Sequence, residues 1–89
     1  MEKYEVLLEK RAVKQLQSLD DKTKSRVADA LTTLEEGFSA RLDIKKLKGF
    51  RDTFRLRVGG YRIFYVIAPG KKIKVFAILP RESAFERYD

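Results

Sequence analysis

The sequence contains neither cysteine nor histidine among its 89 residues. Without cysteine there is no disulfide framework and no thiol chemistry. Without histidine the chain lacks the commonest general base and the residue that many zinc sites require. We therefore expect no metal and no cofactor, so any chemistry must rest on other side chains.

Long apolar runs are also missing. No segment approaches the ~18 apolar residues that a membrane span needs, and no signal-peptide pattern opens the chain. We expect a cytoplasmic protein that does not associate with membranes. Its length predicts one domain over residues 1–89, and an apolar content of 44% is enough for a modest core.

Positive charge is abundant but unevenly spread. The net charge is +7. Residues 1–40 contain 7 Lys/Arg and 8 Asp/Glu, whereas residues 41–89 contain 13 Lys/Arg and 5 Asp/Glu. Segregated basic charge on a folded domain indicates nucleic-acid binding first and an acidic protein partner second.

The basic half is organised around residues 53–67, in which two β-rich alternating runs flank Gly59-Gly60. A Gly-Gly pair in this position predicts a two-residue hairpin loop, because glycine takes the positive φ that primed turns demand. This register puts Arg57 opposite Arg62. It also separates two faces. One face carries Phe54, Leu56, Val58, Tyr61, Ile63 and Tyr65, and the other carries Arg55, Arg57, Arg62 and Phe64.

The second face is harder to explain by folding alone. Like charges directly opposite each other destabilise a sheet, and neither predicted strand contains an acidic residue to offset Arg57 and Arg62. A phosphate from outside could supply the negative charge, since guanidinium binds phosphate in a bidentate fork. The alternative is a solvated face whose repulsion is screened by salt.

The remaining segments complete an α+β pattern. A strand over residues 4–8 precedes helices over residues 9–18 and about 20–36, and Gly37 is a stop signal. Residues 38–52 look irregular, with a short turn or strand, and residues 73–79 form the last strand. We expect the two-helix hairpin to pack on one face of a four-stranded sheet, whose last three strands form an antiparallel meander. With Pro69-Gly70 as a two-residue loop, Arg62 faces Ala77 and Arg81 falls on the arginine face; a three-residue loop would reverse this.

Two functions suit such a face. Arginines can hold phosphates while an exposed aromatic ring stacks on a base. They could also stabilise the transition state of RNA cleavage, in which a 2′-hydroxyl attacks its own adjacent phosphate. Proton transfer is the weak point of cleavage, because arginine is essentially never deprotonated and histidine is missing. The remaining candidates for it are Lys48, Glu82 and Tyr88. From composition and spacing, a basic nucleic-acid-binding domain therefore stands ahead of a ribonuclease. The residues that we expect to contact RNA are Lys45, Lys46, Lys48, Phe64, Phe85 and Tyr88. The alternative for Phe64 is simple packing on the sheet, and the alternative for the lysines is a solvated surface.

Three stretches carry a family resemblance. Residues 47–50 and 54–65, with their Arg-x-Arg and Gly-x-Tyr-Arg pattern, resemble the RelE/ParE superfamily of toxins from type II toxin–antitoxin systems, and residues 79–85 look like its last strand and tail. Length and element order fit throughout. For RelE-like members the resemblance implies metal-independent cleavage of ribosome-bound mRNA, with an antitoxin, the ribosome and mRNA as partners. A hetero-oligomeric toxin–antitoxin complex is implied as well.

The resemblance also implies roles for particular residues. Arg55, Arg57, Arg62 and Arg81 match the positions of the family's catalytic basic residues. The tail departs from the pattern, because Phe85 stands where many relatives have a tyrosine, and Tyr88 is the nearest phenol. The ParE-like branch, which inhibits DNA gyrase, remains the alternative, together with a basic binding module that has neither activity.

Overall fold

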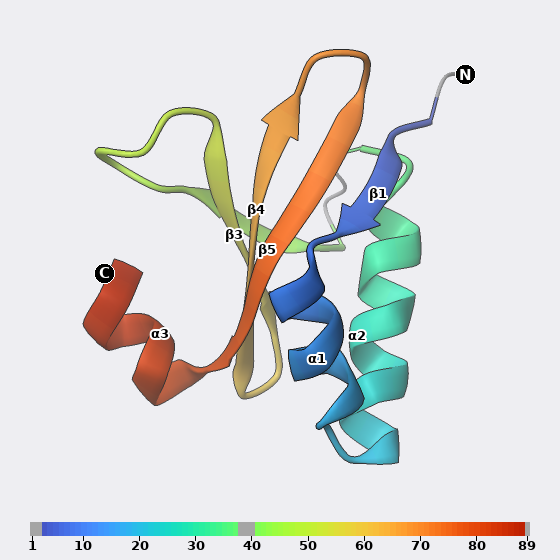
Figure 1. The fold of residues 1–89 in the computed structure, drawn as a ribbon, viewed down its shortest axis with the longest axis vertical. Coiled ribbons are helices and arrows are strands. Elements are labelled where there is room, and N and C mark those ends of the chain that lie inside the picture. Colours follow the sequence, from blue (N-terminus) through green and yellow to red (C-terminus); the bar gives the residue numbers. More distant parts are fainter. Residues whose placement is uncertain (1–2, 38–40, 89) are drawn as a thin grey trace.

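The computed structural model describes residues 3–37 and 41–88, with side chains described as far as residue 84. The element order is β-α-α-β-β-β-β-α (Figure 1). The elements are β1 (Glu5–Leu8), α1 (Lys10–Gln17), α2 (Asp21–Leu34), β2 (Asp43–Lys46), β3 (Thr53–Val58), β4 (Tyr61–Ala68), β5 (Lys72–Pro80) and α3 (Arg81–Tyr88). No helix in this described part combines the length and apolar character needed to cross a membrane.

The sheet has five strands in the order β1-β5-β4-β3-β2, with β1 parallel to β5 and the other pairs antiparallel. The α+β class and the two-helix hairpin are confirmed, but the expected four strands are one too few. The extra strand is β2, which lies in the segment expected to be irregular and pairs with β3. Its residue Ile44 packs against the core, which explains why this short segment joins the sheet edge.

The β3–β4 hairpin has the register predicted from Gly59-Gly60. Val58 pairs with Tyr61, and Arg57 pairs with Arg62. Gly59 has a φ of 56°, the left-handed value that a primed turn requires of its first central residue. The turn therefore fixes which face each side chain of these two strands occupies.

The β4–β5 register differs from the prediction. Ala68 pairs with Lys72, so the loop has three residues, and Arg62 faces Leu79 rather than Ala77. A three-residue loop alone would have reversed the faces. A β-bulge at Phe76, between the pairs that Phe64 and Tyr65 make, reverses them again. The two deviations cancel, so the end of β5 presents the predicted face.

The first core lies between the sheet and the α1–α2 hairpin, which covers one face (Figure 1). From the sheet it includes Leu56, Ile63 and Tyr65, all fully buried. The Gln15 side chain fastens α1 to the sheet, because its Oε1 accepts a hydrogen bond of 2.6 Å from the Ile78 amide. Beyond Val75, β1 no longer pairs with β5, so this bond serves an amide that would otherwise lack a strand partner.

A second, smaller core lies on the opposite face of the sheet. This second core consists of Leu47, Phe64, Ala77, Leu79 and Ala84, with Phe76 packed against it. Ala84 belongs to α3, which lies across the sheet from α1 and α2 (Figure 1). The C-terminal tail is therefore a helix that covers part of the face that carries the arginines.

Burial predicts the stability effect of truncating the first core. Leu56 is 0% exposed, so Leu56→Ala should lower the free energy of unfolding by about 2–5 kcal/mol through lost burial and a residual cavity. Urea denaturation measures this change. Leu7→Ala is the matched control, since Leu7 is 39% exposed, and it should cost about 0.5 kcal/mol. Equal losses at both positions would contradict the assignment of the core.

Candidate functional site

The arginine face is the sheet face opposite α1 and α2. Strand pairing places Arg55 and Arg57 of β3 beside Arg62 of β4 on this face. It also places Asp43 opposite Arg57 and Lys45 opposite Arg55. Three adjacent strands thus bring charged side chains together at one end of the sheet.

Arg62 is the most enclosed of these arginines, with 8% of its surface exposed. Its Nη1 donates hydrogen bonds to the Gly59 carbonyl at 3.1 Å and to the Tyr61 carbonyl at 3.0 Å. The guanidinium is therefore tied to the β3–β4 turn. From the sequence we found no folding role for the arginine face, whereas these bonds give Arg62 a structural role.

The electrostatics around Arg62 show which charges lie near it. Burial is the main cause that lowers the pKa of Arg62, because desolvation disfavours its charged form. The charges of Arg57, Arg55 and Arg81 lower that pKa further, whereas Asp43 raises it. The three other predicted arginines thus lie near enough to Arg62 to act on its charge, as a shared anion site requires.

Arg81 reaches this cluster from the other side of the turn. It is the first residue of α3, and its amide donates a hydrogen bond of 2.9 Å to the Gly60 carbonyl. The two glycine carbonyls of the turn therefore bind two different arginines, one through a guanidinium and one through the main chain. The hairpin turn is the point that positions both ends of the site.

Asp43 is the site residue that the sequence analysis missed. Its Oδ1 lies 3.3 Å from Arg55 Nη2 in an ion pair. From the sequence we considered only acidic residues inside the hairpin strands, and Asp43 lies on β2, a neighbouring strand that the expected four-stranded sheet did not include. The alternation Asp43, Ile44, Lys45 was the available signal, since it predicts a strand with one apolar face.

The other predicted RNA contacts are divided. Lys45 lies on the arginine face, but Lys46 pairs with Phe54 and so lies on the opposite face, where it is distant from the arginines. Lys48 is exposed in the turn after β2. The lysines therefore do not form one continuous patch.

The aromatic predictions fare differently. Phe64 is 1% exposed in the second core, so it is not available to stack on a base, and its packing role was the correct alternative. Its place follows from the same alternation that puts Arg62 on this face. The side chains of Phe85 and Tyr88 lie outside the described residues, so their roles remain predictions.

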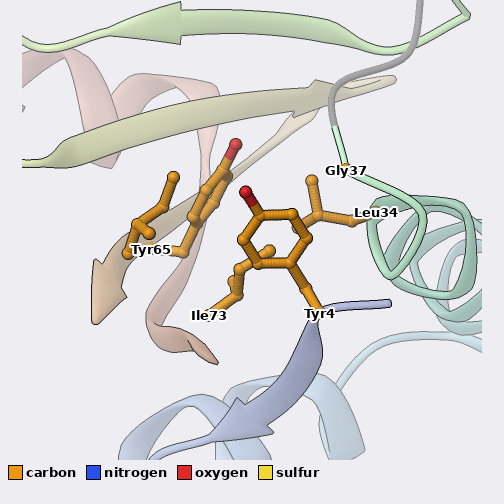
Figure 2. A pocket seen from close by; sticks show the side chains of 6 residues that line it. Tyr4, Leu34, Gly37, Tyr65 and Ile73 are labelled. Atoms are coloured by element: carbon orange, nitrogen blue, oxygen red, sulfur yellow. The ribbon is translucent and has the colours of Figure 1, made fainter. Parts of the chain in front are cut away.

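The three tyrosines with described side chains belong to the other side of the sheet. Tyr65 lies in the first core, and Tyr4 and Tyr61 pack against it. Tyr4 and Tyr65 line a small apolar pocket together with Leu34, Gly37, Ile67 and Ile73 (Figure 2). Burial raises the pKa of Tyr65, and its hydroxyl is buried without a hydrogen-bond partner in the described chain. None of these three phenols can serve the arginine face.

The charges of this face predict a salt effect on stability. Arg57 faces Arg62 across the strand pair, and repulsion between like charges is strongest at low ionic strength. Arg57→Gln should raise the free energy of unfolding by about 0.2–1 kcal/mol at low salt and reduce the gain that the wild type shows as salt is added. Thermal melting across a salt series measures both effects. Lys22→Gln on α2 is the charge-matched control, and a lower melting temperature for Arg57→Gln would contradict the repulsion.

Comparison with known proteins identifies the family. A family model described as the ParE toxin of the type II toxin–antitoxin system parDE matches residues 6–85. A curated relative named toxin RelE3, from Methanocaldococcus jannaschii, is 31% identical over 86 residues, which cover 93% of this chain and 97% of that protein.

Solved structures agree with this assignment. The archaeal RelE–RelB complex from Pyrococcus horikoshii contains a chain with a TM-score of 0.77 and 34% identity, covering 88% of this chain and 94% of that one. The RelB–RelE antitoxin–toxin complex from Methanococcus jannaschii gives a TM-score of 0.77 at 29% identity, covering 93% and 99%. The chain therefore belongs to the RelE/ParE superfamily of type II toxin–antitoxin toxins, and its named relatives favour the RelE-like branch.

Proposed function

We propose that this toxin is a metal-independent endoribonuclease that cleaves mRNA bound to the ribosome. The observation that carries the proposal is the strand pairing that places Arg55, Arg57 and Arg62 on one sheet face, next to Arg81, whose amide is bonded to the hairpin turn. Four guanidinium groups can hold a phosphodiester and oppose the negative charge that grows on it during cleavage.

The arginines can complement the negative charge that develops in this reaction, whereas its two proton transfers need other groups. The RNA 2′-oxygen forms a bond to the adjacent phosphorus while the bond to the 5′-oxygen breaks, which leaves a cyclic phosphate. The pentavalent transition state carries additional negative charge on the non-bridging oxygens, and preorganised donors stabilise such charge strongly. Arg62 is preorganised, because two backbone carbonyls already hold its guanidinium.

Proton transfer requires other groups. Arginine remains protonated, and the three described phenols lie on the far side of the sheet. Tyr88 is the fourth tyrosine of the sequence, and it stays a candidate for moving a proton, together with Lys48 and Glu82. The ribosome would align the mRNA, so that the protein supplies mainly charge.

We also propose a cognate antitoxin as the partner that restrains this activity. The structural relatives from Pyrococcus and Methanococcus are complexes of a RelE toxin with RelB. An acidic antitoxin segment would complement the basic half of this chain and cover its arginines, giving a hetero-oligomer.

The gyrase alternative is the weaker one. Its support is the name of the family model, whereas the curated relative and both archaeal structures are RelE proteins. Primer extension on mRNA in a translating extract separates the two targets. Ribosome-dependent cuts support the proposal, while loss of plasmid supercoiling by gyrase without cuts would replace it.

Arg81 gives the cleanest test of the arginine site. Arg81 is exposed and its described hydrogen bond uses the backbone amide, so Arg81→Ala should keep the fold. We expect a fall of about 10²-fold or more in single-turnover cleavage, the usual cost of removing one transition-state donor, and loss of growth arrest on induction.

The control for this variant is Arg11→Ala on α1, which removes the same charge from an exposed position away from the site. It should cut as the wild type does. If Arg81→Ala lowered the melting temperature steeply while Arg11→Ala did not, Arg81 would be structural and its assignment to the site would be wrong.

A further inference from the structure

Asp43 is out of place in a surface built to bind RNA. It lies opposite Arg57 in the β2–β3 pairing and 3.3 Å from Arg55. A carboxylate beside phosphate-binding arginines repels the phosphate that they would hold. Its position therefore needs a reason other than direct attraction of RNA.

The incomplete hydrogen bonding of the Arg55 guanidinium supplies that reason. The side chain is 17% exposed, and one nitrogen, Nη2, meets Asp43. Its Nε is buried and has no hydrogen-bond partner in the described chain. Guanidinium prefers a fork of two parallel bonds to an anion, so Arg55 is held by one weak contact through Nη2 while Nε, the second donor of a fork, is unused.

Asp43 itself is free to release this contact. Its side chain is 55% exposed, and it lies on β2, which is the last strand at its edge of the sheet. An exposed ion pair of this kind contributes little to stability. A phosphate could therefore displace the carboxylate without disrupting the sheet.

We propose that Asp43 is a positioning residue that holds Arg55 in the RNA-free toxin and is exchanged for an RNA phosphate on binding. This inference rests on the proposed RNA-directed function and adds a device to it. The carboxylate keeps Arg55 in place against the repulsion of its neighbours. Its charge also weakens binding to any single-stranded RNA that cannot offer Arg55 a well-placed phosphate.

The test uses Asp43→Asn, which removes the charge and keeps the shape. The probe is a short single-stranded RNA with 2′-O-methyl groups, which cannot be cleaved. We expect Asp43→Asn to bind this RNA about 3- to 10-fold more tightly than the wild type at low salt. We also expect its affinity to depend more on salt: a plot of log affinity against log salt concentration should be steeper by up to about 0.7.

Matched variants separate exchange from general charge. Asp29→Asn removes an exposed carboxylate on α2 and changes the net charge equally, so it should barely alter affinity. In an Arg55→Gln background, Asp43→Asn should lose its extra effect and behave as Asp29→Asn does. Asp43→Thr, which suits a strand, is a second variant in case Asn perturbs β2, and thermal melting verifies that each variant folds.

Any of three results would overturn the inference. The first is equal RNA affinity and salt slope for Asp43→Asn and Asp29→Asn. The second is weaker RNA binding by Asp43→Asn, and the third is an effect of Asp43→Asn that persists without Arg55. These outcomes are separable from failure of the proposed function. A wild-type protein that shows the exchange but makes no ribosome-dependent cuts would refute the nuclease and leave the exchange standing, whereas a wild type that binds no RNA would refute both.

Discussion

The β3–β4 turn is the constraint on which the site depends. Gly59 takes a positive φ, and this turn pairs Arg57 with Arg62. Its two carbonyls also accept hydrogen bonds from the Arg62 guanidinium and the Arg81 amide. A shift of one residue in this turn would send the arginines of one strand into the first core, because side chains alternate faces. One local geometry therefore decides both the core and the charged face.

This dependence explains how much the sequence could predict. The β3–β4 register involves residues separated by a two-residue turn, so the glycine pair and the alternation determine it locally. The β4–β5 register does not follow in this way. Lys71 adopts a φ of 55° and adds a third residue to the loop. A lysine in the sequence does not indicate a residue with positive φ. The bulge at Phe76 lies in a strand whose two faces are both apolar, so the alternation of apolar and polar residues could not predict it.

The second core was also beyond local reasoning. Phe64 alternates onto the arginine face, and nothing near it in the sequence shows what would cover it. Its partners Leu47 and Ala84 come from segments far away on either side. The same limit hid Asp43, because β2 is too short to be recognised without its partner strand. Local patterns thus located the arginines, whereas the groups that surround them required the tertiary structure.

The second core gives the arginine face its particular chemistry. Arg62 has Arg57 on one flank and Leu79 on the other, so it lies where a charged surface borders a buried apolar cluster. Burial there disfavours its charge, and it strengthens any interaction with an incoming anion, because the surroundings are less polarisable than water.

A sheet selected for stability alone would place an acid or an apolar residue opposite Arg62. The structure instead keeps Arg57 and Arg62 together beside the buried second core. This arrangement becomes favourable when an anion binds between the two arginines. Under the proposed function, RNA phosphate and an acidic antitoxin segment would both bind these arginines through their negative charge, so binding of one should exclude the other.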